Sequence, residues 1–501
     1  MIKRLPGRHP DLASRRARAL LGLAMMATPC LVERALMAAE KPSAAHAQLL
    51  QLVDQSAPGY VQTSRAIWEQ PELGYHEEKS SAALQAALKQ AGFTVTAGVA
   101  GEPTAFVASY GEGKPVIGIL GEFDALPGLS QDTVADRKPI TAGAPGHACG
   151  HNLLGSGAAL AAVALREYLE RHHVKGTLRY YGTPAEEGGS GKVYLLRAGL
   201  FNDVDAVLQW HPADHNAVAN GGMLAIVSAK FTFHGIAAHA AAAPERGRSA
   251  LDAVMLTGTG VEYLREHVPS NTRIHYTITK GGVAPNVVPD LAELYIMARS
   301  PSQTTLDGIW ARILKIEEGA GLMTETHYET HIIGASANII GNDVLAKVAQ
   351  KNLEQVGGFR YTAEEQQFAL ELQKSLPPES VKPLERATEV QPPTPFDPNA
   401  PSASTDVGDI SWNVPTIGVV TATFVPGVAP HTWQAAASAG MSIGQKGMVV
   451  AAKALALTGA DLFANPQLVK DARSEFQRQL QGKTYTSLIP ADQKPPLDYA
   501  F

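Results

Sequence analysis

The chain has 501 residues, of which 45% are hydrophobic and 18% are charged, a composition typical of a folded globular protein. At roughly 150 residues per domain, this length predicts two or three domains and excludes a small disulfide-stapled scaffold. The formal net charge of −6 and the 6% aromatic content disfavour nucleic-acid binding, because they indicate neither a basic surface nor a platform for base stacking.

The N-terminal segment, residues 1–40, has the features of an export leader. Arginines dominate its first part, and residues 20–32 then form a largely apolar stretch that is too short to span a bilayer comfortably. The pair Arg15 and Arg16 suggests twin-arginine export. We therefore expect a periplasmic or secreted protein, with a cytoplasmic protein carrying a basic extension as the alternative. No later segment has eighteen uninterrupted apolar residues, so we expect no membrane span in the mature chain.

Helical and strand patterns alternate between residues 41 and 222, which favours an α/β domain whose parallel or mixed sheet is covered by helices on both faces. The Ala-rich stretch 151–169 is the clearest helix, and the apolar run 115–120 is the clearest buried strand. Residues 47–88 are expected to be mostly helical, a short helix is expected over 193–200, and the other expected strands span 177–182 and 205–210.

The pattern of expected elements changes between residues 223 and 336, where their order is strand, helix, strand, strand, helix, strand. This order is that of a ferredoxin-like α+β domain. Ser249 with Asp252 and Thr304 with Asp307 have the spacing of N-terminal caps for its two helices. The expected strands span 224–234, 273–280, 291–299 and 325–333, and the expected helices span 249–267 and 304–322.

The alternating pattern resumes at residue 337 and continues to 480, so the ferredoxin-like domain is expected to be inserted into the first one. The Pro- and Ser-rich stretch 374–403 is expected to be a long surface loop. A strand over 416–424 and a helix over 440–457 follow, and residues 481–501 are expected to form a weakly ordered tail.

Acidic residues and histidines directly follow three of the expected strands. Glu122 and Asp124 follow the first, Glu186 and Glu187 follow the second, and His211 follows the third. In open α/β sheets, sites form outside the carboxyl ends of the strands. We therefore expect these side chains to meet at one edge of the sheet.

Cys149 and His151 lie in the segment GHACGH at the start of the Ala-rich helix. A thiolate and an imidazole at this spacing can bind one metal ion, and such donors favour zinc, or manganese or cobalt where carboxylates join them. Of the adjacent Glu186 and Glu187, one can bind the metal while the other acts as general base on a metal-bound water. The alternatives are an inert buried cysteine with a helix-start histidine, and a solvated acidic turn.

Four further residues are candidates for the same site. His211 and His431 are either metal ligands or surface histidines, and Asp124 can orient a ligand histidine through a hydrogen bond. His239 lies in the inserted domain and needs domain closure or a partner subunit to reach the others.

The ordered series of motifs resembles the aminoacylase and carboxypeptidase superfamily of di-metal hydrolases. Within it, the chain is similar to the amidohydrolase branch, which includes hydrolases of auxin conjugates, hippurate and p-aminobenzoyl-glutamate. The resemblance covers roughly residues 45–480. Its motifs are GILGEFDALPG, GAPGHACGHNLLG, GTPAEEGG, VLQWHP, GIAAHAAAAPERGRSALDAV, GGVAPNVVPDLAE, STDVGDISW and PHTWQA.

This resemblance implies a catalytic domain formed by residues 41–222 and 337–480, with residues 223–336 as a lid or dimerisation domain. It implies two divalent metal ions, zinc or manganese, with Cys149 bridging them. The implied metal ligands are Cys149, His151, Glu187, His211 and His431.

The resemblance also implies roles for residues that do not bind metal. Glu186 matches the general base, His239 matches a histidine that reaches the oxyanion across a dimer, and Asn286 matches a polar lid residue near the substrate. Many members of the superfamily have a histidine where this chain has Glu122. In the amidohydrolase branch, the Cys-x-His pair supplies ligands instead.

The implied activity is metal-dependent hydrolysis of the amide bond in N-acyl or N-aroyl amino acids such as p-aminobenzoyl-glutamate. Auxin–amino acid conjugates and other N-acyl amino acids are alternative substrates, and Arg299 or Arg246 is a candidate for binding the substrate carboxylate. A homodimer through the inserted domain is expected, with a heteromer of paralogous subunits as the alternative. A non-catalytic partner subunit or a metal- or ligand-binding protein is the alternative from another class.

Overall fold

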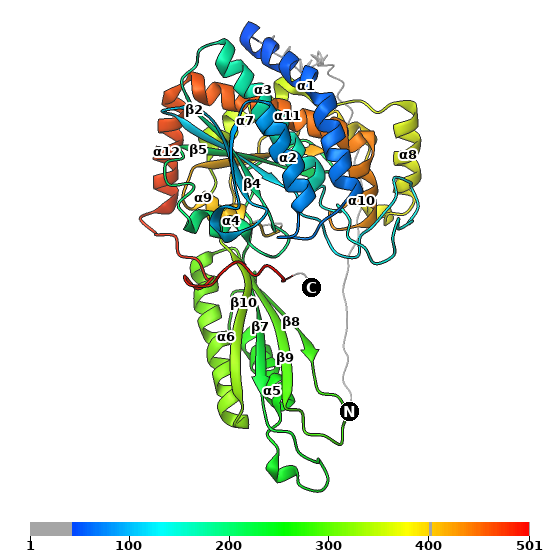
Figure 1. Cartoon of the computed structure of the whole chain (residues 1–501), viewed down its shortest axis with the longest axis vertical. Helices are drawn as coiled ribbons and strands as arrows, with labels where there is room; N and C mark the ends of the chain where they lie inside the picture. The colour runs from blue at the N-terminus through cyan, green and yellow to red at the C-terminus, as the bar shows by residue number, and fades with distance from the viewer. Residues whose placement is uncertain (1–42, 400–402, 500–501) are drawn as a thin grey trace, which may run out of the picture. The chain divides into compact units, whose positions relative to one another are not determined.

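In the computed structural model, residues 43–399 and 403–499 are described, and the export leader expected at residues 1–40 lies outside them. The strands in these ranges form two separate sheets, one of seven strands and one of four (Figure 1). We call the part built on the seven-stranded sheet the larger domain. The part built on the four-stranded sheet is the inserted domain.

The seven-stranded sheet has the strand order β1-β2-β4-β3-β5-β11-β6. Its four inner strands β4, β3, β5 and β11 are parallel neighbours, while β1, β2 and β6 pair antiparallel at the edges. The carboxyl ends of the parallel strands therefore meet at one edge. The strands are β1 (Thr94–Ala97), β2 (Phe106–Glu112), β3 (Val116–Glu122), β4 (Gly176–Thr183), β5 (Ala206–Ala213), β6 (Ala217–Ala219) and β11 (Thr416–Ala422).

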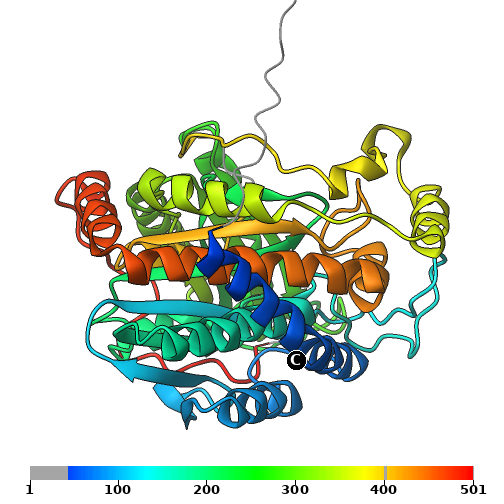
Figure 2. The same ribbon diagram turned by 90° about the horizontal axis from the view of Figure 1, so that it is seen from above.

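Helices cover both faces of this sheet. Ile117 and Ile119 of β3 pack into the core that contains α1, α3 and α11, whereas Leu120 packs on the other face against Leu195 of α4 and Ile410 of α9. The layer with α1, α3 and α11 is seen from above in Figure 2. The helices of the larger domain are α1 (Ala44–Glu69), α2 (Glu78–Gln90), α3 (His151–Arg171), α4 (Gly191–Arg197), α7 (Asp343–Val356), α8 (Ala363–Gln373), α9 (Val407–Ser411), α10 (Trp433–Gly440), α11 (Ser442–Ala464) and α12 (Pro466–Leu480).

Helix α11 is, among the described residues, the one helix long and apolar enough to cross a membrane. Within the fold, 78% of its most apolar window is buried, and it packs on α3 and β11. A helix that is apolar on all sides and buried is typical of the core of a large domain.

The inserted domain has the order β7-α5-β8-β9-α6-β10, and its sheet order is β10-β7-β9-β8 with all neighbours antiparallel. This is the expected ferredoxin-like arrangement. Helices α5 and α6 pack on one face, over a core that includes Phe231, Ile296 and Trp310. The elements are β7 (Ala225–His234), α5 (Ala250–Arg265), β8 (Arg273–Lys280), β9 (Leu291–Ser300), α6 (Gln303–Thr324) and β10 (His327–Ser336).

The stretch 47–88, expected to be mostly helical, belongs to two helices, α1 and α2, because the chain leaves helical geometry after Glu69. Pro71 follows directly, and proline disfavours helical geometry in the residue before it. Tyr75 then has a φ of 66°, which cannot continue a right-handed helix. Strands β1 and β2 were not expected, since β1 is a short edge strand with a mostly exposed surface and carries little hydrophobic pattern.

One of the two expected helix caps is confirmed. The Ser249 hydroxyl accepts a hydrogen bond from the Asp252 amide at the start of α5. The cap expected at Thr304 is wrong, because Ser302 caps α6 by accepting from the Thr305 amide. Two hydroxyl residues two positions apart offer competing caps, and the sequence pattern alone did not rank them.

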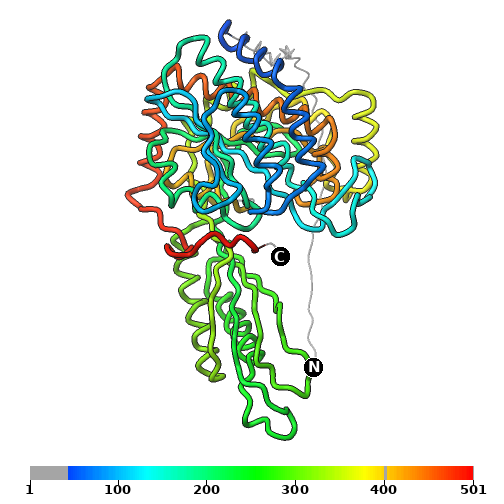
Figure 3. Tube along the Cα trace, viewed as in Figure 1, coloured from blue at the N-terminus to red at the C-terminus, as the bar shows by residue number. Residues whose placement is uncertain are grey.

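The C-terminal segment, residues 481–499, differs from the expected weakly ordered tail. It runs in extended form across the junction between the larger domain and the inserted domain (Figure 3). Ile489 in this segment is only 2% exposed and belongs to the core of the inserted domain. We call residues 481–499 the C-terminal strap.

Candidate metal centre and active site

The candidate site lies at the carboxyl edge of the seven-stranded sheet. Glu122 ends β3, and Glu186 and Glu187 follow β4. His211 lies near the end of β5, two residues before the strand ends at Ala213. Because β4, β3 and β5 are parallel neighbours, the three strands bring these side chains to one place.

Three groups of side chains in the described part of the chain could each hold a metal ion, with candidate ligand atoms within 4.8 Å of one another. Cys149 and His151 each belong to two of these groups, so the three groups are contiguous. The groups are Cys149, His151 and His211; Cys149, Glu187 and His431; and Glu122, His151 and Glu186. The structure thus brings together all five residues that sequence resemblance implied as metal ligands.

The spacing of the donor atoms suits a bound ion. Cys149 Sγ and His211 Nε2 are 3.4 Å apart. Two ligands of one tetrahedral zinc ion, at about 2.3 Å for sulfur and about 2.0 Å for nitrogen, stand about 3.5 Å apart. His431 Nε2 and Glu187 Oε2 are 3.2 Å apart, which is also compatible with a shared ion.

Buried polar atoms without hydrogen bonds lie at the same place. Within the described residues, His151 Nε2, Glu122 Oε2 and Glu187 Oε1 are buried and accept or donate no hydrogen bond. Such atoms are rare in native proteins unless an ion or a water satisfies them. Burial raises the pKa of the Cys149 thiol well above its ordinary value, and binding to a metal ion is the interaction that deprotonates such a thiol. The residues therefore fit a metal centre.

Asp124 holds two of these ligands in place. Its Oδ1 lies 2.8 Å from Nδ1 of His151, and its Oδ2 accepts a hydrogen bond from the Glu187 amide at 2.9 Å. Burial lowers the pKa of His151, but Cys149 and Asp124 outweigh that effect and raise it well above its ordinary value. The Nδ1 contact leaves Nε2 of His151 free to face an ion, as in other carboxylate–histidine–metal arrangements.

The adjacent carboxylates of Glu186 and Glu187 have opposite proton affinities. Burial, followed by the negative charges of Glu122 and Glu187, raises the pKa of Glu186 well above its ordinary value. Burial also acts on Glu187, but His431 and His151 outweigh it and lower the pKa of that carboxyl. A pair of acids whose pKa values are driven apart is the pattern expected when one takes protons and the other stays ionised.

A cavity of about 380 Å³ opens between this edge and the sheet of the inserted domain. Glu186, Glu187 and His431 lie on one side, and Tyr295 and Arg299 of β9 lie on the other. Arg299 is half-buried, and its guanidinium, unlike its backbone in β9, forms no ion pair or hydrogen bond within the described ranges. A desolvated, unpaired guanidinium in a cavity with the candidate general base is suited to bind a carboxylate.

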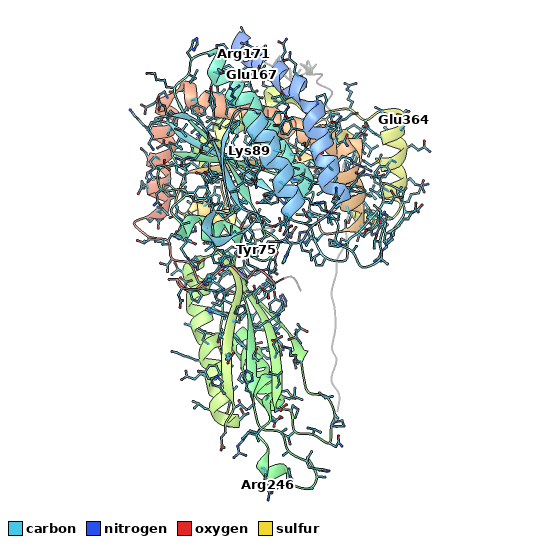
Figure 4. All side chains as sticks on the ribbon, in the orientation of Figure 1. Tyr75, Lys89, Glu167, Arg171, Arg246 and Glu364 are labelled. Carbon is cyan, nitrogen blue, oxygen red and sulfur yellow. The ribbon has the colours of Figure 1, made fainter. Side chains whose placement is uncertain are left out.

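Arg246, the other candidate for a carboxylate, does not lie in this cavity. Its side chain is 81% exposed beside Glu245, and it sits at the far end of the inserted domain from the larger domain (Figure 4). The structure therefore favours Arg299 over Arg246 within one chain.

His239 and Asn286 also lie away from the cavity. They are neighbours, since the Ala240 amide donates to the Asn286 carbonyl and His239 bridges to Val287. Both side chains are exposed. From Ile226 in the cavity wall, β7 runs to His234, a span of about 26 Å at about 3.3 Å per residue. The structure does not bring these two residues to the metal ligands of their own chain.

Comparison with known proteins identifies the family. Residues 118–456 match the peptidase family M20/M25/M40. The chain belongs to this family. The resemblance inferred from the ordered motifs is thereby confirmed, and the protein is a hydrolase that acts on amide bonds.

Two relatives match most of this chain. The B subunit of p-aminobenzoyl-glutamate hydrolase from Escherichia coli (strain K12) is 41% identical over 460 residues, which cover 87% of this chain and 95% of the relative. The Xaa-Arg dipeptidase of Mus musculus is 31% identical over 463 residues, which cover 88% of this chain and 95% of the relative.

Solved structures show the same fold. An aminobenzoyl-glutamate utilization protein from Klebsiella pneumoniae is 19% identical and superposes with a TM-score of 0.59, covering 83% of this chain and 98% of that one. A dinuclear metal binding peptidase of the M20 family from Bacillus subtilis is 18% identical with a TM-score of 0.54, covering 82% of this chain and 99% of that one.

A buried ion network behind the site is not evident from the sequence pattern. Lys192 is fully buried, and its Nζ lies 2.7 Å from Glu122 and 2.6 Å from Asp406. The two carboxylates raise the pKa of Lys192 against the lowering effect of burial. Because an unpaired buried charge is very costly, this lysine permits Glu122 to stay ionised beside the metal ligands. Asp406 lies in the motif STDVGDISW, which could have pointed to it.

Proposed function

We propose that the protein hydrolyses the amide bond of N-acyl or N-aroyl amino acids, with p-aminobenzoyl-glutamate as the first substrate to test. The observation that carries the proposal is a single cavity that holds the carboxylate of Glu186, the Glu187 and His431 ligands, and the unpaired cation of Arg299. The name of the 41% identical relative from Escherichia coli supports the choice of substrate.

The metal ligands would be Cys149, His151, Glu187, His211 and His431, holding two divalent ions, zinc or manganese. Bound ions would lower the pKa of a water molecule and polarise the scissile carbonyl. Asp124 keeps His151 and the Glu187 turn in position through its two hydrogen bonds.

Glu186 would act as the general base. Its raised pKa suits a carboxylate that accepts a proton from the attacking water near neutral pH. The same carboxyl group would then pass that proton to the leaving amine, so the group returns to its ionised form. Lys192, which lowers the pKa of Glu186 against the raising effects of burial and the nearby acids, would limit how far the base is neutralised before the reaction.

Arg299 would bind the α-carboxylate of the substrate. This places the carboxylate on the β9 side of the cavity, and the amide between it and Glu186. A guanidinium can hold a carboxylate by two parallel hydrogen bonds, which fixes the orientation of the amide as well as adding affinity.

A homodimer through the inserted domain would supply His239 and Asn286 to the site of the partner subunit. Exposed apolar side chains on this domain support the proposal, because large exposed apolar patches mark interaction surfaces. Met255 and Tyr263 on α5 are 57% and 72% exposed, and Val283 beside β8 is fully exposed. A heteromer is the second arrangement to test, since the Escherichia coli relative is named as one subunit of its hydrolase.

Export to the periplasm or the medium is also proposed, on the arginine-rich and apolar pattern of residues 1–40. Fractionation of the native host with an antibody, together with sequencing of the mature N-terminus, tests it. Recovery of the intact N-terminus from the cytoplasm would contradict export.

The central experiment uses residues 41–501 loaded with manganese or zinc. Hydrolysis of p-aminobenzoyl-glutamate is followed by mass spectrometry beside Glu186→Ala, with auxin–amino acid conjugates, hippurate and Xaa-Arg dipeptides as a panel. Release of both products by the wild type alone supports the proposal. Metal-loaded, folded protein that releases neither product from any N-acyl amino acid would contradict it and favour a partner subunit without activity of its own.

A further inference from the structure

The C-terminal strap is fixed to the larger domain by several specific contacts. The Tyr485 hydroxyl donates a hydrogen bond to Asp409 Oδ1 at 2.6 Å. Arg197 donates to the backbone carbonyls of Ile489 and Gln493 at 3.0 and 3.1 Å. These contacts hold the strap at three separate points along its length.

The strap also contacts the inserted domain. Gln493 Nε2 donates to the carbonyl of Ile332 in β10 at 2.7 Å, and Ile489 is buried in the core of that domain. The strap thus joins both domains, and its last described residue, Tyr499, contacts the larger domain at Tyr75.

Tyr499 packs against the turn that carries the candidate base. Its ring lies edge-on to Tyr75, with ring centroids 5.8 Å apart. A Cβ atom added at Gly188 or Gly189 would stand only 2.8 or 2.9 Å from the Tyr499 ring, so the ring lies directly on this stretch of backbone. Figure 4 marks the position of Tyr75 at the junction of the two domains. Tyr499 is not among the residues that line the active-site cavity, whereas Glu186, Glu187 and Gly188 are, so its ring contacts the turn outside that lining.

The supported turn has a backbone that needs such support. Ala185 and Ser190, on either side of Glu186 and Glu187, have φ angles of 57° and 54°. Left-handed geometry in residues other than glycine persists only where surrounding contacts hold it. Glu77 accepts a hydrogen bond from the Ala185 amide at 2.9 Å.

Tyr75, the neighbour of Tyr499, completes the support of this turn. Its hydroxyl donates to the Gly189 carbonyl at 2.8 Å. Tyr499 therefore packs both on the turn itself and on the tyrosine that hydrogen-bonds to it.

We propose that Tyr499 is a positioning residue for catalysis: its ring, packed on Gly188 and Gly189, fixes the Glu186–Gly189 turn without lining the cavity. The inference rests on the proposed function, in which Glu186 is the base and Glu187 binds metal. Small displacements of catalytic groups can cost about 100-fold in rate. The Tyr499 ring of the C-terminal strap therefore controls activity without touching the substrate.

The test compares Tyr499→Ala with Tyr499→Phe, which keeps the ring, and with Asp498→Ala, an exposed neighbour in the strap. We expect the alanine variant to lose about 10- to 100-fold in kcat with KM changed by less than about 3-fold. The kcat of Tyr499→Phe should stay within about 3-fold of the wild-type value, and the kcat of Asp498→Ala should equal the wild-type value. Amide hydrogen exchange of residues 185–191 should accelerate in Tyr499→Ala only.

A Tyr499→Ala variant with wild-type kcat and wild-type exchange of that turn would overturn the proposal, and so would equal losses in the alanine and phenylalanine variants. Circular dichroism monitors folding, and Tyr499→Leu takes the place of the alanine variant if that variant unfolds. If the wild type hydrolyses no N-acyl amino acid, the proposed function fails. Hydrogen exchange and the manganese retained after dialysis then still decide whether Tyr499 positions the turn.

Discussion

At the edge of the seven-stranded sheet, the candidate functional residues contact one another and all but the exposed His431 are buried or half-buried, whereas those at the far end of the inserted domain are exposed. Asp124 contacts both His151 and the Glu187 amide, and Lys192 neutralises the acids behind them. His239 is exposed, and within the described ranges its ring accepts hydrogen bonds from the Ala241 and Ala242 amides of its own loop. The first region can form its geometry within one chain. Under the proposed function, the second region takes part in catalysis only where a partner subunit covers it.

The largest expected effect is at the first region, at Glu186. Replacing Glu186 by alanine should lower kcat by about 100- to 10,000-fold, because the attacking water loses its base. Metal content should stay at the wild-type level, since the ligand set remains. Elemental analysis and steady-state kinetics measure both, with the exposed Glu112→Ala as control. A loss of metal equal to the loss of rate would mean that Glu186 is a ligand instead.

The next effect tests whether the second region acts across a dimer. His239→Ala should lower kcat by about 100- to 1,000-fold, as expected for loss of one oxyanion donor. Mixed dimers of His239→Ala with Glu186→Ala, formed by co-expression, should have about half of wild-type activity, because each carries one intact site out of two. Purified mixed dimers, separated by two affinity tags, are the sample to measure. Mixed dimers as inactive as either parent would exclude action in trans.

A pH effect on stability is expected from Glu317 in the inserted domain. This residue is 1% exposed, and burial raises its pKa from 4.5 to about 7, although the Thr330 hydroxyl partly offsets the effect. The folded state therefore holds the proton between these pH values while the unfolded state has released it. Stability contributed by the protonated form is full below pH 4.5 and falls as pH rises toward 7, by about 3 kcal/mol in total.

The Glu317→Gln variant removes this titration. It should gain thermal stability relative to the wild type as pH rises from about 5 to about 8, while the exposed Glu318→Gln should not. Calorimetric scans across this range measure the difference. Parallel curves for the wild type and Glu317→Gln would mean that the carboxyl is not protonated in the folded chain.

The smallest expected effect concerns the cavity that joins the two regions. Arg299→Met should raise KM for p-aminobenzoyl-glutamate about 10- to 100-fold, because the lost contact is a charge-assisted pair with the substrate carboxylate. The kcat value should change less. Arg478→Met, an exposed residue of α12, is the control. A substrate whose carboxylate is blocked as an ester or amide should be hydrolysed equally by Arg299→Met and Arg478→Met. If Arg299→Met still prefers the free carboxylate over the blocked one, the carboxylate binds elsewhere.

Much of this architecture could be predicted from local sequence. Strand β3 is a continuous apolar run that ends in an acid. The order of elements in the inserted domain follows from hydrophobic residues that alternate between a strand period and a helix period. Placement after strands predicted that Glu122, Asp124, Glu186, Glu187 and His211 meet at one edge, whereas the full ligand set with His431 came from the resemblance of the ordered motifs. What failed were features decided by competition or by distant contacts. Ser302 and Thr304 offered two caps two residues apart, and only packing of α6 selects one.

The C-terminal strap and Lys192 illustrate the second kind of failure. The strap has no hydrophobic period, because its contacts are single side chains such as Tyr485, Ile489 and Tyr499 that reach different neighbours. Lys192 follows a glycine-rich turn, and lysine is usually a surface residue, so the sequence predicts an exposed side chain. Only the fold shows that Glu122 and Asp406, 284 positions apart in the chain, meet at its amine.

The position of β11 in the sheet has a consequence for how the protein is made. This strand lies between β5 and β6, and β6 pairs with no other strand of the described chain, yet about 200 residues separate β6 from β11 along the chain. At a synthesis rate of about 5–20 residues per second, β6 waits about 10–40 s on the ribosome for its neighbour. The inserted domain, whose four strands are contiguous in sequence, can fold during that interval. The growing chain can therefore fold the strands and helices of its inserted domain before the catalytic sheet closes, and Ile489 of the strap joins the core of that domain afterwards.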